Sequence, residues 1–135
     1  MFKHILVPSD GSELSQEAVR HAIRFAKEAG AYIIAFYARP DKFGLQIEQY
    51  AQEVLGFVEN LCKETGVPCR KLSWASDSPH KVIIEAAEKF GCDLIFMASN
   101  GHKGINAVLL GSTTQEVLTH SAIPVLVYRP PRLPT

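Results

Sequence analysis

The chain has 135 residues, a length that fits one ordinary domain and is too short for two. Hydrophobic residues make up 47% and charged residues 21%, a balance that excludes wholesale disorder. Lys plus Arg and Asp plus Glu both number 14, so no net charge attracts nucleic acid or an anionic membrane, and we expect neither partner.

Segments for export or membrane insertion are not expected. No stretch approaches the ~20 apolar residues of a membrane helix, and the opening MFKHILVPSDG lacks the long apolar centre and cleavage site of a signal peptide. We therefore expect a cytoplasmic protein. Cys62, Cys69 and Cys92 form no CxxC pair, which argues against a disulfide framework and a zinc cage. Cys92 adjoins an apolar run and is expected in the core.

The first half of the chain predicts strand, helix, strand, helix. HILVPSD is a short apolar run, and residues 10–30 then carry apolar side chains at helical spacing, with Asp10 and Ser12 suited to the helix start and Gly30 to its end. Residues 31–38 are apolar on both parities, which is typical of a strand covered on both faces of a parallel sheet. A second helix is predicted from Phe43 to Thr65 and ends at Gly66.

The second half predicts three further strands and two helices. Residues 67–75 form a weaker strand, and the next helix begins with Ser78 as N-cap and Pro79 at its first position. CDLIFMAS is a buried strand, a short helix follows Ser112, and IPVLVYRP is the last strand. The prolines that follow predict a domain over residues 1–130 and a tail over 131–135.

Strands that alternate with helices predict a doubly wound α/β fold, in which parallel strands are joined by right-handed crossovers. Ligands of such sheets bind beyond the carboxyl ends of the strands, near the point where the strand order reverses. The segments PSDGS, ARPD and ASNGHKG follow three of the predicted strands. We therefore expect these three loops to converge on one site.

The segment ASNGHKGINAVLLGSTT, residues 98–114, is the strongest candidate for a phosphate site. Glycine permits positive φ and lets main-chain amides approach a ligand, and a helix that begins after Gly111 offers unpaired N–H donors. The hydroxyls that follow Gly111 can add donors, and His102 and Lys103 are candidates for positive charge. Two structural alternatives stay open: Gly101 and Gly104 make turns while Ser112 caps the helix, and Asp10 forms an N-cap or Asx turn.

Neither common nucleotide signature is present, since the chain has no GxxxxGK[ST] and no GxGxxG after its first strand. However, FKHILVPSDGSELSQEAVRHAIRFAKEAGA, DLIFMASNGHKG and LLGSTTQEVLTHSAIPVLVYR resemble the universal stress protein (UspA-like) family across nearly the whole chain. The ATP-binding branch of that family has glycine, two residues, glycine, nine residues, then glycine with Ser or Thr. Gly101, HKGINAVLL, Gly111 and Ser112 match this motif, whereas Ala98 replaces its first glycine and Asn100 stands where His is common.

The resemblance implies a five-stranded sheet of order 3-2-1-4-5, similar to the adenine nucleotide alpha hydrolases, and a site for ATP with Mg²⁺ accompanying the phosphates. It places Pro8, Ser9 and Asp10 beside the adenosine, Ala38 against the adenine, and the glycine loop around the phosphates. The full predicted set is Pro8, Ser9, Asp10, Ala38, Ala98, Ser99, Asn100, Gly101, Gly104, Gly111, Ser112, Thr113 and Thr114.

The sequence favours a nucleotide-dependent stress or signalling module with at most slow hydrolysis. A dedicated hydrolase needs a positioned base and metal-binding carboxylates, but Asp93 is expected at the opposite sheet edge and Glu116 a turn into the last helix. The alternatives are a nucleotide-free scaffold of the same family and a slow ATPase. By resemblance, Ile123 to Tyr128 forms an edge strand that pairs two copies into a homodimer; an ordinary interior strand is the alternative.

Overall fold

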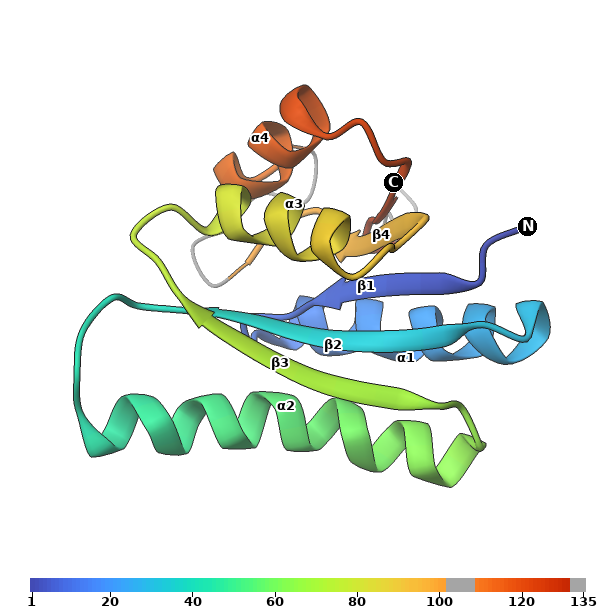
Figure 1. Cartoon of the computed structure of the whole chain (residues 1–135), viewed down its shortest axis with the longest axis horizontal. Helices are drawn as coiled ribbons and strands as arrows, with labels where there is room; N and C mark the ends of the chain where they lie inside the picture. The colour runs from blue at the N-terminus through green and yellow to red at the C-terminus, as the bar shows by residue number, and fades with distance from the viewer. Residues whose placement is uncertain (102–108, 132–135) are drawn as a thin grey trace.

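A computed structural model describes residues 1–101 and 109–131, and within them strands and helices alternate along the chain (Figure 1). The strands are β1 His4–Pro8, β2 Tyr32–Arg39, β3 Cys69–Ala75, β4 Leu94–Ala98 and β5 Val125–Tyr128. The helices are α1 Glu13–Ala29, α2 Leu45–Thr65, α3 Pro79–Lys89 and α4 Ser112–His120. None of the described helices is long and apolar enough to cross a membrane.

The five strands form one parallel sheet in the order β3-β2-β1-β4-β5, which confirms the predicted fold. Helices α1 and α2 cover one face, and α3 and α4 cover the other (Figure 1). The strand order reverses at β1, which pairs with β2 on one side and β4 on the other. Loops that leave the carboxyl ends of β1 and β4 therefore start next to each other.

Both faces of the sheet are covered by helices and buried from water. This explains why the odd-numbered and the even-numbered residues of the central strands are both apolar. On the face covered by α1 and α2, Ile5 and Val7 of β1 belong to the buried core. On the opposite face, Leu6 and Phe36 belong to a second core with residues of α3 and α4. Phe36 is completely buried and meets Trp74 edge-on at a centroid separation of 5.8 Å, so these two aromatics pack together in the second core.

The helix ends follow the capping signals in most places. Ser12 caps α1, because its Oγ accepts a hydrogen bond from the Ser15 N–H at 3.3 Å, and Gly30 and Gly66 end α1 and α2 in the left-handed region. Helix α2 begins two residues after the predicted Phe43. Ser78 is the N-cap residue of α3 and Pro79 its first residue, as predicted, but the Ser78 side chain makes no capping hydrogen bond. Its φ of −132° and ψ of 83° depart from the extended backbone of a usual N-cap.

Replacing Gly56 by alanine is expected to increase the free energy of unfolding by about 1 kcal/mol. Gly56 lies inside α2, and a Cβ built on it meets no atom within 4 Å, so the substitution gains helix propensity without a clash. Chemical denaturation of the two proteins measures the difference. An unchanged or lower stability would show that this position has a constraint other than the helix backbone.

Candidate functional site

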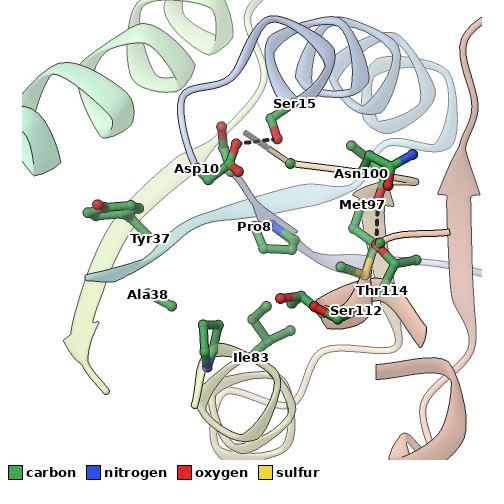
Figure 2. Close-up of a pocket in the computed structure, with 16 residues that line it drawn as sticks. Pro8, Asp10, Ser15, Tyr37, Ala38, Ile83, Met97, Asn100, Ser112 and Thr114 are labelled. Carbon is green, nitrogen blue, oxygen red and sulfur yellow. Dashed lines mark hydrogen bonds between the residues drawn. The ribbon is translucent and has the colours of Figure 1, made fainter. Parts of the chain in front are cut away.

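A cavity of about 630 Å³ lies beyond the carboxyl ends of the strands, where the order of the sheet reverses (Figure 2). Its walls come from the ends of β1, β2 and β4, from the loops after β1 and β4, and from the first turns of α1, α3 and α4. The predicted convergence is therefore present for the loops after β1 and β4, whereas of the segment ARPD only Ala38, at the end of β2, lines the cavity. The lining residues are Pro8, Ser9, Asp10, Ser15, Tyr37, Ala38, Pro79, Ile83, Met97, Ala98, Asn100, Gly101, Gly111, Ser112, Thr113 and Thr114.

Of the predicted site residues that the structure describes, all but Ser99 lie in this lining. Ser99 is completely buried; its N–H donates to the Tyr128 carbonyl at 2.8 Å and its carbonyl accepts from the Gly111 N–H at 2.8 Å. Ser99 thus ties the loop to β5 and to the start of α4. Gly104, together with His102 and Lys103, falls outside the described residues.

Sequence reasoning missed five lining residues: Ser15, Tyr37, Pro79, Ile83 and Met97. Pro79 and Ile83 come from α3, whose start follows a strand that also ends at this sheet edge. The predicted third strand could have pointed to Pro79 and Ile83, because in a parallel sheet every loop from a strand to the next helix lies at the same edge. Tyr37 packs edge-on to Tyr50 at 5.8 Å and also faces the cavity.

Asp10 combines a structural role with a position in the cavity. Its Oδ1 accepts hydrogen bonds from the Ser12 N–H at 3.0 Å and from the Ser15 hydroxyl at 2.8 Å, so the Asx-turn alternative is correct. Its carbonyl accepts from the Tyr50 hydroxyl at 2.5 Å. Burial and the Asp10 charge raise the pKa of Tyr50, while burial and then Tyr50 and Asp10 raise that of Tyr37. Both phenols therefore stay protonated near neutral pH.

The loop glycines provide space for close packing. Gly111 has an ordinary φ of −67° and Gly101 has no positive φ, so the expected use of positive φ does not apply to either of them. A Cβ on Gly101 would overlap the Asp10 Oδ2 and lie 3.2 Å from its Cγ, and a Cβ on Gly111 would lie 3.0 Å from the Asn100 Oδ1. The absent side chain at Gly101 lets the loop after β4 pack against Asp10 of the loop after β1, and the one at Gly111 lets the start of α4 pack against Asn100.

Helix α4 begins at the cavity without a capping side chain. Its N-cap is Gly111, so the alternative in which Ser112 caps the helix is wrong. The N–H groups of the first turn have no partner within the helix and carry the positive end of its dipole. Thr114 is buried, and its hydroxyl donates to the Ala98 carbonyl at 2.9 Å (Figure 2). Thr114 therefore anchors α4 on β4, and of the three consecutive hydroxyls after Gly111 those of Ser112 and Thr113 can donate to a ligand.

The other acidic candidates lie away from this cavity. The Asp93 carboxylate accepts from the Lys3 N–H at 2.9 Å and from the His4 N–H at 3.1 Å, at the amino edge of the sheet, as predicted. Glu116 lies 3.2 Å from the Nε2 of His120 and does not line the cavity. Among the described lining residues, Asp10 is the only carboxylate. Within residues 1–101 and 109–131, no three His, Cys, Asp or Glu side chains are grouped so that they could hold a metal ion.

The whole chain is similar to known proteins. The Universal stress protein family profile, Usp, matches residues 1–129. Universal stress protein MJ0531 of Methanocaldococcus jannaschii is 34% identical, over 98% of this chain and 85% of that protein. The solved structure of MJ0577, from the same organism, has a TM-score of 0.80 at 28% identity and covers 98% of this chain and 99% of that chain. A universal stress protein solved in complex with cAMP has a TM-score of 0.77 at 22% identity, over 94% and 97% of the two chains.

Proposed function

The chain belongs to the Universal stress protein family, and from this premise we propose that it binds an adenine nucleotide, ATP with Mg²⁺, as a dimeric regulatory module. The observation that carries the proposal is the start of α4, which has no capping side chain and faces the cavity. The same cavity is lined by apolar side chains and by the carboxylate of Asp10. The crystallised complex of a structural neighbour with cAMP supports it. In this proposal residues 1–130 form the binding domain, residues 131–135 are a tail, and the protein works in the cytoplasm.

The apolar part of the cavity suits an adenine ring. Ala38, Ile83 and Met97 line it with aliphatic and thioether groups, and Pro8 adds its apolar pyrrolidine ring (Figure 2). Ligand pockets of this kind use apolar contact for affinity and a few polar groups for orientation. Asp10 is the orienting group, because a carboxylate accepts hydrogen bonds from ribose hydroxyls but repels phosphate.

The opposite wall suits the phosphates. The first-turn amides of α4 and the hydroxyls of Ser112 and Thr113 offer donors without a bulky side chain at Gly111. Mg²⁺ would offset part of the phosphate charge when bound, and Asp10 is the one carboxylate among the described lining residues that could hold it. The chain's own residues bind and orient the nucleotide. Without an assigned base for water, hydrolysis is at most slow in this proposal.

Two hydrogen bonds connect the proposed nucleotide site to the strands at the edge of the sheet. The Ser99 N–H donates to the Tyr128 carbonyl, and the Thr114 hydroxyl donates to the Ala98 carbonyl. A ligand that holds the loop and the start of α4 therefore also stiffens the β4–β5 pair. We propose that the nucleotide state acts on partners through this edge, at a homodimer interface formed by residues 123–128.

The dimer is expected at β5 because of the two edge strands' composition. Edge strand β3 carries the charges of Arg70 and Lys71, whereas β5 is the apolar sequence VLVY with its side chains partly exposed. Charged edges resist pairing and apolar ones invite it. Two copies of β5 that pair antiparallel form a closed two-fold interface.

Replacing Val127 by proline is expected to dissociate the dimer and leave the monomer folded. The Pro124 and Tyr128 carbonyls accept hydrogen bonds from N–H groups of β4 and of Ser99, which follows it. Because the backbone groups of successive residues in a strand face opposite sides, the N–H of Val127 points away from β4. Proline at such a position removes a donor from the outer edge alone. Sedimentation equilibrium measures the change against Val127→Ala, which keeps the N–H. A dimer that survives the proline change would place the interface elsewhere.

The most direct chemical test is mass spectrometry of small molecules released from freshly purified, denatured protein. We expect an adenine nucleotide in the released fraction. We also expect a higher melting temperature with MgATP, since a ligand at about 100 times its Kd adds about 2.7 kcal/mol. Absence of any nucleotide, with an unchanged melting temperature at millimolar MgATP, would favour a nucleotide-free scaffold. Steady phosphate release that depends on Asp10 would favour an ATPase.

A further inference from the structure

Helix α2 and strand β3 form a hairpin that places Cys62 and Cys69 side by side. The chain turns at Gly66–Pro68, where the Gly66 and Val67 N–H groups both donate to the Cys62 carbonyl, at 2.8 and 2.9 Å. Cys62 belongs to the core between α2 and the sheet, and Cys69 packs against that core from the first position of β3. Cys69 thus contacts the cluster that contains Cys62, and the two thiols are close enough for an interaction between them to shift the pKa of each. Sequence spacing alone gave no sign of this pair, because the two residues belong to different elements.

An independent contact holds the register of this hairpin. The Lys71 ammonium lies 3.3 Å from the Glu59 carboxylate, one step further from the turn than the cysteines. Glu59 and Cys62 are three residues apart and share a helix face, while Cys69 and Lys71 are two apart and share a strand face. The ion pair and the thiol pair are therefore successive contacts of the same two surfaces. Sliding α2 along β3 would break both.

The two thiols have different chemical environments. Cys62 is 1% exposed, whereas Cys69 is partly buried on an edge strand and can be reached from solvent. The interaction with Cys62 lowers the pKa of the Cys69 thiol, with help from the Lys71 charge, although burial and Glu59 oppose the shift. The same interaction and burial raise the pKa of Cys62. Cys69 is therefore the better nucleophile, because the thiolate is the reactive form.

Cys92 provides an internal comparison. It lies in the core on the opposite sheet face and is 6% exposed. Burial, with the charge of Asp93, raises the pKa of its thiol to about 11. Buried thiols of this kind are chemically inert. A modification specific to the hairpin should therefore leave Cys92 unchanged.

We propose that Cys62 and Cys69 form a modification site for hydroperoxides, at which Cys69 is oxidised first and Cys62 then closes an intramolecular disulfide. The Cys69 thiolate attacks one peroxide oxygen, the O–O bond breaks, and a sulfenic acid and hydroxide form. The Cys62 sulfur then attacks the sulfenic sulfur, and the hydroxyl leaves with the Cys62 proton as water. Two thiols lose two electrons to one peroxide, which is reduced to two waters or, for an organic peroxide, to an alcohol and water.

Peptide mapping of the intact protein after hydrogen peroxide treatment tests this site without any substitution. Trypsin cleaves after Lys63 and after Arg70, so the two cysteines fall in separate peptides. We expect these peptides to be joined, with a mass two hydrogens below their sum, and the count of free thiols to fall from the three cysteines of the sequence to the single Cys92. Three surviving thiols, a link through Cys92, or a link only between chains would overturn the proposal.

Variants assign the two roles. In Cys62→Ser, Cys69 should stop at the sulfenic acid and be trapped by dimedone, whereas in Cys69→Ser the oxidation of Cys62 should be at least about tenfold slower. Cys92→Ser is the matched control and should form the disulfide as the unchanged protein does. Circular dichroism verifies that each variant is folded. Equal oxidation rates at Cys62 and Cys69 would contradict the assigned order.

Discussion

Replacing Gly101 by valine is expected to lower nucleotide affinity at least about 100-fold, or about 2.7 kcal/mol, while the fold stays intact. Any Cβ at this position overlaps the Asp10 Oδ2. The carboxylate cannot turn away freely, because Ser12 and Ser15 both donate to its other oxygen. The valine therefore displaces either Asp10 or the loop after β4. Both changes disturb the contact between Asp10 and the loop after β4, which forms the wall of the cavity between the proposed ribose and phosphate positions.

Isothermal titration with MgATP measures this loss, and a thermal melt verifies the fold. Gly56→Ala is the control, because it too replaces a glycine. At Gly56, unlike at Gly101, an added Cβ meets no atom within 4 Å. The control should keep the affinity of the unchanged protein. A folded Gly101→Val protein with undiminished affinity would mean that the nucleotide does not depend on this wall.

Replacing Asp10 by asparagine is expected to lower nucleotide affinity about tenfold or more with little change in stability. An amide oxygen can still accept from Ser12 and Ser15, so the Asx turn survives. The amide NH₂ then takes the place of Oδ2, which faces the loop at Gly101, and it cannot accept a hydrogen bond. Loss of one hydrogen bond to a charged group accounts for about 1.5–3 kcal/mol.

Asp10→Ala separates the two roles of this residue. It removes the acceptor for Ser12 and Ser15 as well as the charge, so stability should also fall, by about 1–3 kcal/mol. Titration calorimetry and chemical denaturation of all three proteins give the two quantities independently. If asparagine binds MgATP as tightly as aspartate, the carboxylate serves the turn alone and the proposed ribose contact is wrong.

Most of the fold could be predicted because local signals and tertiary packing agree. Residues 31–38 are apolar on both parities, and β2 is buried on both faces in the middle of a parallel sheet. Gly30 and Gly66 follow apolar helical stripes, and both end their helices in the left-handed conformation. The strand order came from family resemblance, since periodicity identifies strands but not their neighbours.

Several site details depend on contacts between distant residues, so the sequence pattern could not supply them. Thr114 follows Ser112 and Thr113 as a third hydroxyl, yet its donor is used by the Ala98 carbonyl 16 residues earlier. Gly101 is small because Asp10 packs against it, a pairing between the ends of two strands. Ser78 stands at the predicted N-cap position, but its φ of −132° and ψ of 83° accompany the loss of the capping hydrogen bond, which residue type alone does not reveal.

A crystal structure of the protein with excess MgATP tests the central claim most directly. We expect the adenine against Ala38, Ile83 and Met97, and phosphate oxygens within hydrogen-bond distance of the first-turn amides of α4. A nucleotide bound elsewhere, or a start of α4 occupied by the protein's own side chains while the nucleotide stays in solution, would contradict the account.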